Sequence, residues 1–173
     1  FNEIIKMTIG EFNSLTVQQQ KDELFKCCGC LAWVDNLSEK IPFDSIEKLK
    51  IESDGIWFSL NEKDWLEAFT NHPKIGDIKS LEKKFASTKL WASGEQLGVN
   101  IATQNVLKEL KEMNDEYEKK FGYIFIVCAT GKSAEEMLSM LKSRLKNSSE
   151  EEIKIASQEQ NKITHLRIDK LFS

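Results

Sequence analysis

The sequence predicts an all-α protein, a single-domain helical bundle of about seven or eight helices that covers residues 1–173. The 173 residues include only 8 Gly and 2 Pro, a composition that argues against long loops. Apolar residues recur along most of the chain at three- and four-residue spacing, which is the period of an amphipathic helix. At 19.9 kDa the chain suits one domain with a core that needs neither disulfides nor a structural metal.

The N-terminal half contains predicted helices with recognisable start and stop signals. The segment VQQQKDELFKCC follows Thr16 and places apolar residues near one face, and CLAWVDNLSEKIP continues helically until Pro42 stops it. Ser45 begins the helix IEKLKIESDGIWFSL, and Asn61 begins EKDWLEAFTN with Asp64 at its third position. Side-chain oxygens at these starts accept hydrogen bonds from the first free N–H groups of a helix.

The C-terminal half contains the longest predicted helix, from Glu95 to about Lys120, which Gly122 ends. The letters YIFIVCA at 123–129 indicate a short buried extended segment. Two more helices follow, joined by a turn at NSS. Glu150–Glu152 then lie in the first turn of the last helix, where negative charge is favourable.

The stretch FIVCATGKSAEE has the outline of a nucleotide phosphate-binding loop, because Gly131-Lys132-Ser133 follows a buried segment and precedes a helix. That motif requires a glycine five residues before Gly131, and this position holds Ile126. No other strand pattern is present to build the parallel sheet that surrounds such a loop. We therefore interpret Gly131 as a turn and Ser133, with Glu136 three residues later, as a helix capping box.

Charge and composition exclude several classes of partner. The net charge of -4 and pI of 5.4 give no general attraction to nucleic acid or to an anionic membrane. No apolar segment approaches the roughly 18 residues of a membrane span, and no secretory signal opens the sequence. We expect neither a nucleic acid nor a membrane as partner.

The four cysteines are Cys27, Cys28, Cys30 and Cys128, three of them crowded within four positions. This is not the spacing of a disulfide framework, and CCGC lacks the paired spacing and the distant partner pair of a zinc site. We expect reduced thiols that pack between helices, no metal, and a cytoplasmic protein.

Three stretches carry candidate site residues, and each also has a purely structural interpretation. His72 precedes a proline, so we expect it where a helix ends. Its imidazole either exchanges protons with a substrate or simply caps the helix C-terminus at the surface. In WASGEQLG, Ser93 and Gln96 form a capping box, or else the helix start binds a polar heterocycle with Glu95 and Gln96. Arg167, in an apolar final helix, either pairs with a glutamate or extends to water, or else binds a substrate carboxylate.

Four segments together resemble the OHCU decarboxylase family along nearly the whole chain: NHPKIGD, WASGEQ, NDEYEKKFGYIFIVCATG and KITHLRIDKL. OHCU stands for 2-oxo-4-hydroxy-4-carboxy-5-ureidoimidazoline, a compound of urate degradation. The resemblance implies an all-α, cofactor-free decarboxylase that acts on OHCU as a homodimer and leaves (S)-allantoin. It also implies that the FIVCA segment lines a substrate pocket.

Residue by residue, the resemblance assigns catalysis to His72 and Glu95. It assigns substrate binding to Pro73, Ala92, Ser93, Gly94, Glu95, Gln96, Phe125, Ile126, Val127, Cys128, Ala129 and Arg167. Members of the family often have a serine where this chain has Ala92, and Ser93 lies one place later.

The chemistry of the reaction suits these residue types. We expect His72 to transfer a proton, Glu95 and Gln96 to orient the ureido and ring groups, and Arg167 to supply fixed positive charge. These groups are expected to converge around one small cavity. The alternative is a non-catalytic helical interaction module on the same scaffold, which would present an exposed apolar groove instead.

Overall fold

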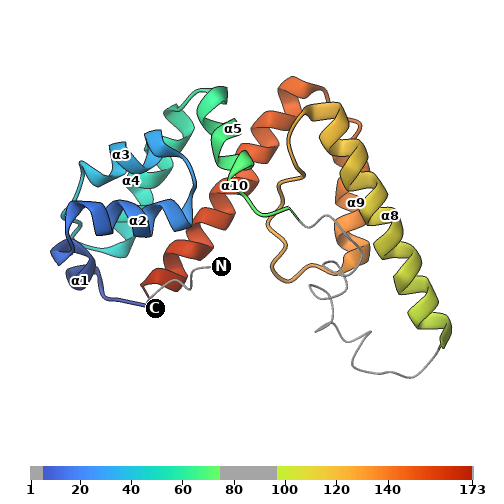
Figure 1. Ribbon diagram of the computed structural model, residues 1–173, viewed down its shortest axis with the longest axis horizontal. Coiled ribbons are helices and arrows are strands. Elements are labelled where there is room, and N and C mark those ends of the chain that lie inside the picture. Colours follow the sequence, from blue (N-terminus) through green and yellow to red (C-terminus); the bar gives the residue numbers. More distant parts are fainter. Residues whose placement is uncertain (1–5, 75–96, 173) are drawn as a thin grey trace. The chain divides into compact units, whose positions relative to one another are not determined.

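The computed structural model describes residues 6–74 and 97–172, and these ranges contain eight α-helices and no strand (Figure 1). The helices are α1 (Ile9–Ser14), α2 (Val17–Cys27), α3 (Leu31–Ser38), α4 (Ile46–Ser59), α5 (Glu62–Thr70), α8 (Leu97–Phe121), α9 (Ala134–Arg144) and α10 (Ser149–Leu171). The all-α prediction is confirmed. Among the described helices, none combines the length and the apolar character needed to cross a bilayer.

The chain divides into two compact units. The first comprises residues 1–72, 126–128 and 156–173, and the second comprises residues 73–125 and 129–155. Helix α10 contributes residues 156–171 to the first unit and residues 149–155 to the second.

Helices of the first unit begin at the predicted capping residues. Thr16 Oγ1 accepts the Gln19 N–H at 3.2 Å, and the Gln19 side chain accepts the Thr16 N–H at 3.0 Å, so a complete capping box starts α2. The Ser45 and Asn61 side chains likewise accept from the N–H three residues later, at 3.1 and 3.0 Å. Local hydrogen bonding therefore sets these three boundaries, as predicted.

The prediction that α3 continues until Pro42 stops it is wrong by three residues. The helix ends at Ser38, whose hydroxyl donates to the Asp35 carbonyl at 2.8 Å. The chain then makes a turn in which the Lys40 N–H donates to the Leu37 carbonyl at 3.0 Å. A serine hydroxyl that bonds to the backbone competes with the helical pattern, which explains the earlier end.

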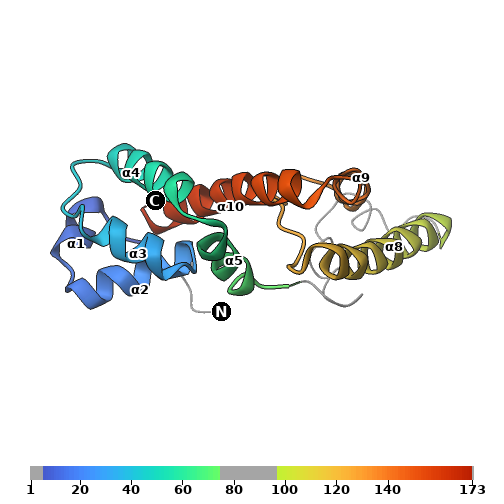
Figure 2. The ribbon, with the colours of Figure 1, turned by 90° about the horizontal axis from the view of Figure 1, so that it is seen from above.

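The core of the first unit forms where the C-terminal half of α10 lies among α1 to α5 (Figures 1 and 2). The Trp57 indole N–H donates to the Ser157 carbonyl at 2.9 Å, and Trp57 is 1% exposed. The Phe12 and Phe172 rings meet edge to face at 5.4 Å. Large side chains that are fully buried here include Leu24, Trp33, Leu37, Leu49 and Phe69. Burying each contributes roughly 1.5–3 kcal/mol to the stability of this unit, and the Trp57 and Phe12 contacts join the C-terminal residues to the N-terminal helices.

The second unit contains α8 packed against α9. Gly122 has φ +83° directly after α8, a conformation that favours glycine and ends the helix where the sequence predicts. Gly131 has φ +75° in a turn, and Ser133 Oγ accepts the Glu136 N–H at 3.2 Å as the cap of α9. The interpretation of Gly-Lys-Ser as a turn followed by a helix cap is confirmed, and residues 124–129 have no regular secondary structure.

The first turn of α10 differs in part from the sequence-based expectation. Glu150 and Glu151 are exposed, as expected for acids at a helix N-terminus, and Ser148 Oγ caps the helix by accepting the Glu151 N–H at 3.2 Å. Glu152 is instead fully buried and pairs with Arg144 at 2.6 Å. Its role is to compensate a buried guanidinium rather than to interact with the helix dipole in solvent.

Candidate functional site

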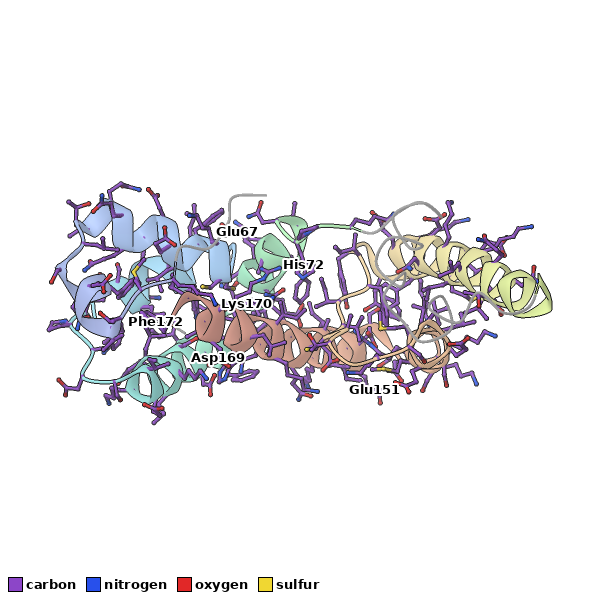
Figure 3. All side chains as sticks on the ribbon, turned by 90° about the horizontal axis from the view of Figure 1, so that it is seen from below. Glu67, His72, Glu151, Asp169, Lys170 and Phe172 are labelled. Carbon is purple, nitrogen blue, oxygen red and sulfur yellow. The ribbon has the colours of Figure 1, made fainter. Side chains whose placement is uncertain are left out.

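His72 lies just beyond the end of α5, where the proline rule predicts it. The helix ends at Thr70, and the His72 N–H donates to the Phe69 carbonyl at 3.2 Å in the closing turn. The imidazole is half-buried, and the following Pro73 is exposed. Figure 3 shows Glu67 on α5 and His72 just past the end of the helix. A short hydrogen-bonded turn thus holds the imidazole without embedding it in a helix face.

A close contact with the turn between α2 and α3 supports the His72 turn. The Asn71 side-chain amide donates to the Gly29 carbonyl at 2.8 Å. A Cβ atom added to Gly29 would lie 2.6 Å from the Asn71 Cβ, so only glycine permits this approach. Sequence reasoning missed Gly29, because it treated CCGC only as a cluster of thiols. An isolated glycine between buried cysteines was the available signal.

We expect Gly29→Ala to lower the free energy of unfolding by about 1–3 kcal/mol, since the methyl group would displace the Asn71 backbone. Gly55→Ala is the matched control. Gly55 lies inside α4 with nothing within 4 Å of an added Cβ, so alanine there should stabilise by about 0.5–1 kcal/mol. Urea denaturation of both variants measures the difference. Equal effects at the two positions would contradict the close-contact argument.

The three clustered thiols are buried and free, as expected. Burial, partly offset by the Arg167 charge, raises the pKa of Cys27 from 9.0 to about 12. Burial also raises the pKa of Cys28, with the neighbouring Cys30 adding to the effect. These thiols are protonated at neutral pH, which makes them packing groups rather than nucleophiles.

We expect Cys27 to resist alkylation in the folded protein. With a pKa of about 12, its thiolate fraction at pH 8 is roughly 10⁻⁴. Because folding raises this pKa, the stability linked to the protonated thiol is complete below pH 9.0 and is lost as pH rises through about 12. Iodoacetamide labelling followed by mass spectrometry, in native buffer and in urea, tests this. Native labelling of Cys27 as fast as that of the half-buried Cys128 would contradict it.

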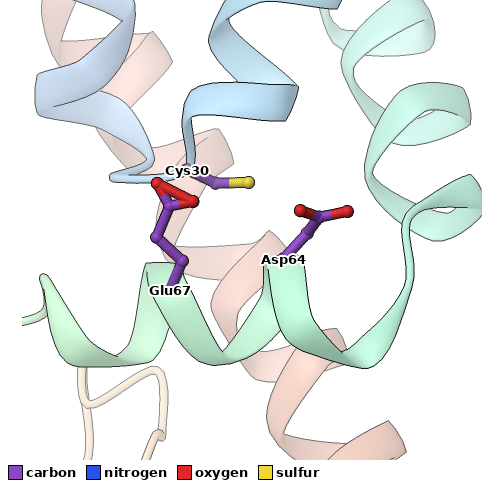
Figure 4. A group of neighbouring side chains, drawn as sticks. All are labelled: Cys30, Asp64 and Glu67. Atoms are coloured by element: carbon purple, nitrogen blue, oxygen red, sulfur yellow. The ribbon is translucent and has the colours of Figure 1, made fainter.

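Cys30, Asp64 and Glu67 form the one group in the described ranges whose side chains could hold a metal ion (Figure 4). Their ligand atoms lie within 4.8 Å of one another. Glu67 already accepts the Leu31 N–H at 3.1 Å, at the first residue of α3, and burial raises the pKa of Cys30. A carboxylate at a helix N-terminus needs no ion to explain it, so we assign Glu67 to capping of α3.

Arg167 extends from α10 to the C-terminal end of α2. Its Nη1 donates to the carbonyl of Cys27, the last residue of that helix, at 3.4 Å, and the side chain is half-buried. A cation that contacts a free carbonyl at a helix C-terminus is favourable, and a guanidinium has further donors for other acceptors. Within residues 6–74 and 97–172, Arg167 contacts this backbone carbonyl rather than a glutamate.

The non-helical segment next to α10 is held by a residue that sequence reasoning missed. Ile126 and Val127 are buried and Cys128 is half-buried. The Cys128 N–H donates to Oε1 of Glu159 at 3.3 Å, and Glu159, which is only 5% exposed, also pairs with Lys162 at 2.5 Å. Glu159 follows Ala156 by three positions on the apolar face of α10, and an acid at such a position was the available signal.

The remaining candidates fall elsewhere. Ala92, Ser93, Gly94, Glu95 and Gln96 lie outside the described residues. Phe125 and Ala129 belong to the second unit, where the Phe125 ring meets the Tyr117 ring at 5.2 Å. The structure places His72, Ile126, Val127, Cys128 and Arg167 in the first unit.

Comparison with known proteins gives a consistent result. Residues 13–169 match the OHCU decarboxylase family. The uric acid degradation bifunctional protein TTL of Arabidopsis thaliana is 41% identical over 154 residues, which cover 88% of this chain and 47% of that protein. The 2-oxo-4-hydroxy-4-carboxy-5-ureidoimidazoline decarboxylase of Xenopus laevis is 35% identical over 77 residues, 44% of each protein. The chain spans less than half the length of these curated relatives.

Solved structures agree. An OHCU decarboxylase crystallised in the presence of (S)-allantoin is 39% identical, with a TM-score of 0.71, and the match covers 87% of this chain and 97% of that one. A structure of (S)-allantoin synthase also has a TM-score of 0.71, with 16% identity over 96% of this chain and 54% of that one. At that identity the second match supports the fold alone.

Proposed function

We propose that this chain, which belongs to the OHCU decarboxylase family, removes CO₂ from 2-oxo-4-hydroxy-4-carboxy-5-ureidoimidazoline and leaves (S)-allantoin. The observation that carries the proposal is the likeness, at 39% identity over 97% of its length, to an OHCU decarboxylase crystallised with (S)-allantoin. We further propose that residues 1–173 act as one domain, since the family match at 13–169 runs through both units.

In the proposed reaction the bond between the carboxylate and the ring carbon breaks, CO₂ leaves, and the electron pair stays on the substrate. The neighbouring C=N accepts this pair, so neither pyridoxal nor thiamine is needed. A proton is then delivered to one face of the carbon, which fixes the configuration of the product. The protein's task is to orient the carboxylate, stabilise the developing charge and control the proton.

We assign the proton transfer to His72, whose half-buried imidazole is held by a short turn beside Pro73. Arg167 supplies fixed positive charge from a side chain that the Cys27 carbonyl orients. Glu95 and Gln96 bind the ureido and ring groups, and Ala92, Ser93 and Gly94 complete that stretch. Backbone groups of residues 125–129 provide further polar contacts.

We also propose that the protein works as a homodimer in the cytoplasm. The free cysteines are compatible with a reducing compartment. The dimer rests on the family resemblance, and light scattering of the purified protein measures it directly.

The test uses OHCU generated in place from urate by the upstream enzymes. We expect the protein to speed the disappearance of OHCU and to yield optically active allantoin, followed by absorbance and circular dichroism. Decay at the spontaneous rate to the racemate would reject the decarboxylase assignment and favour a non-catalytic interaction module.

A further inference from the structure

We propose that Tyr117, Arg144 and Glu152 are positioning residues that fix the non-helical segment 124–129 through the ring of Phe125. The effect on substrate binding rests on the proposed function. The fixed position of the segment does not, because it is a property of the fold. All four residues lie in the second unit.

The three polar side chains form one buried network, and the Asn147 side-chain amide donates to the other Glu152 oxygen, Oε2, at 3.0 Å. Arg144 donates to Oε1 of Glu152 through Nε at 2.6 Å, and the Tyr117 hydroxyl donates to the same oxygen at 2.6 Å. Nη2 of Arg144 lies 3.4 Å from the Tyr117 hydroxyl oxygen. Tyr117 and Glu152 are fully buried and Arg144 is 6% exposed. Burial raises the pKa of Tyr117, so its hydroxyl stays protonated and acts as a donor.

The network is centred on Phe125. The guanidinium carbon of Arg144 lies 4.6 Å from the centre of the Phe125 ring, and the Tyr117 ring meets the same ring edge to face at 5.2 Å. Phe125 thus makes a cation–π contact with Arg144 and an aromatic contact with Tyr117. These contacts come from the regular helices α8 and α9.

A purely stabilising role explains the network poorly. Apolar side chains of similar volume at such sites are often as stable as a buried ion pair or more so, because they avoid desolvation of the charges. The segment 124–129 has no regular secondary structure to fix its path. Side-chain anchors must therefore set its conformation, and an Arg held by Glu152 is a rigid, flat anchor for a ring.

The decisive variant replaces the network by apolar groups: Tyr117→Phe/Arg144→Met/Glu152→Leu. The matched control is Lys142→Met/Glu109→Leu, which removes an exposed ion pair at 2.5 Å between the same two helices, α8 and α9. We expect the network variant to keep its melting temperature and its helical circular dichroism. Its native alkylation rate at Cys128, which lies in the segment, should rise roughly 10-fold as the segment opens locally. The control should leave that rate unchanged.

The kinetic readout uses OHCU as substrate. We expect kcat/KM of the network variant to fall roughly 10- to 100-fold, because the binding segment is misplaced. Phe125→Leu should lower kcat/KM by a similar factor. Combining it with the network variant should lower kcat/KM little further, since both changes remove the same contact with the Phe125 ring. An unchanged Cys128 labelling rate, or fully additive losses, would overturn the inference. If labelling rises but the wild-type chain does not consume OHCU, the positioning role stands and the proposed reaction fails.

Discussion

His72→Ala is expected to lower kcat on OHCU by about 10²-fold or more while the helical fold survives. The residue lies in a turn after α5, half-buried, and its side chain is not part of the apolar core. Removing it deletes the proposed proton-transfer group and leaves the Asn71–Gly29 contact that supports the turn. The stereochemical purity of the allantoin should fall as well, because protonation would then occur from solvent.

The chain's second histidine provides the control, since the sequence contains 2. His165 on α10 pairs with Asp54 at 2.6 Å, and its side chain is 30% exposed. His165→Ala should leave kcat and the product configuration unchanged and cost at most about 1 kcal/mol of stability, as solvent-screened pairs do. Steady-state kinetics with chiral analysis of the product compare the two variants. Near-wild-type formation of (S)-allantoin by His72→Ala would refute the proton-transfer role.

The helices were predictable because the interactions that begin and end them are local in sequence. The Ser45, Asn61 and Ser133 side chains each bond to an N–H three residues away, and Gly122 ends α8 through its own φ angle. Such interactions can be predicted from a few neighbouring residues. The position of His72 followed from the same logic, because the restriction before a proline acts on the adjacent residue.

The supports of the candidate site were not predictable in this way. Gly29 meets Asn71 across 42 positions, and Glu159 accepts from Cys128 across 31. The position of Glu159 on the apolar face of α10 indicates burial, but nothing in the nearby sequence identifies the N–H group to which its carboxylate is bonded. The packing of α10 buries Glu159. Because a buried carboxylate needs hydrogen-bond donors, it accepts from an N–H that is distant in sequence.

Glu152 shows the same limit and leads to the largest expected effect on stability. Its neighbours Glu150 and Glu151 are exposed, yet Glu152 is fully buried against Arg144. Glu152→Ala leaves the guanidinium buried without its carboxylate and removes the acceptor of the Tyr117 hydroxyl. We expect a loss of about 3–5 kcal/mol in the free energy of unfolding, measured by urea denaturation.

Two comparisons separate the charge effect from simple loss of volume. Glu109→Ala removes the partner of Lys142 at an exposed site, so it should cost no more than about 1 kcal/mol. The apolar variant Tyr117→Phe/Arg144→Met/Glu152→Leu removes the same carboxylate together with the charge it compensates, and it should be close to the wild type in stability. If the apolar variant is as unstable as Glu152→Ala, the loss reflects packing. If it is stable while Glu152→Ala is not, the carboxylate is required because Arg144 is charged, and the function of that charge must be sought in the Phe125 ring that it contacts.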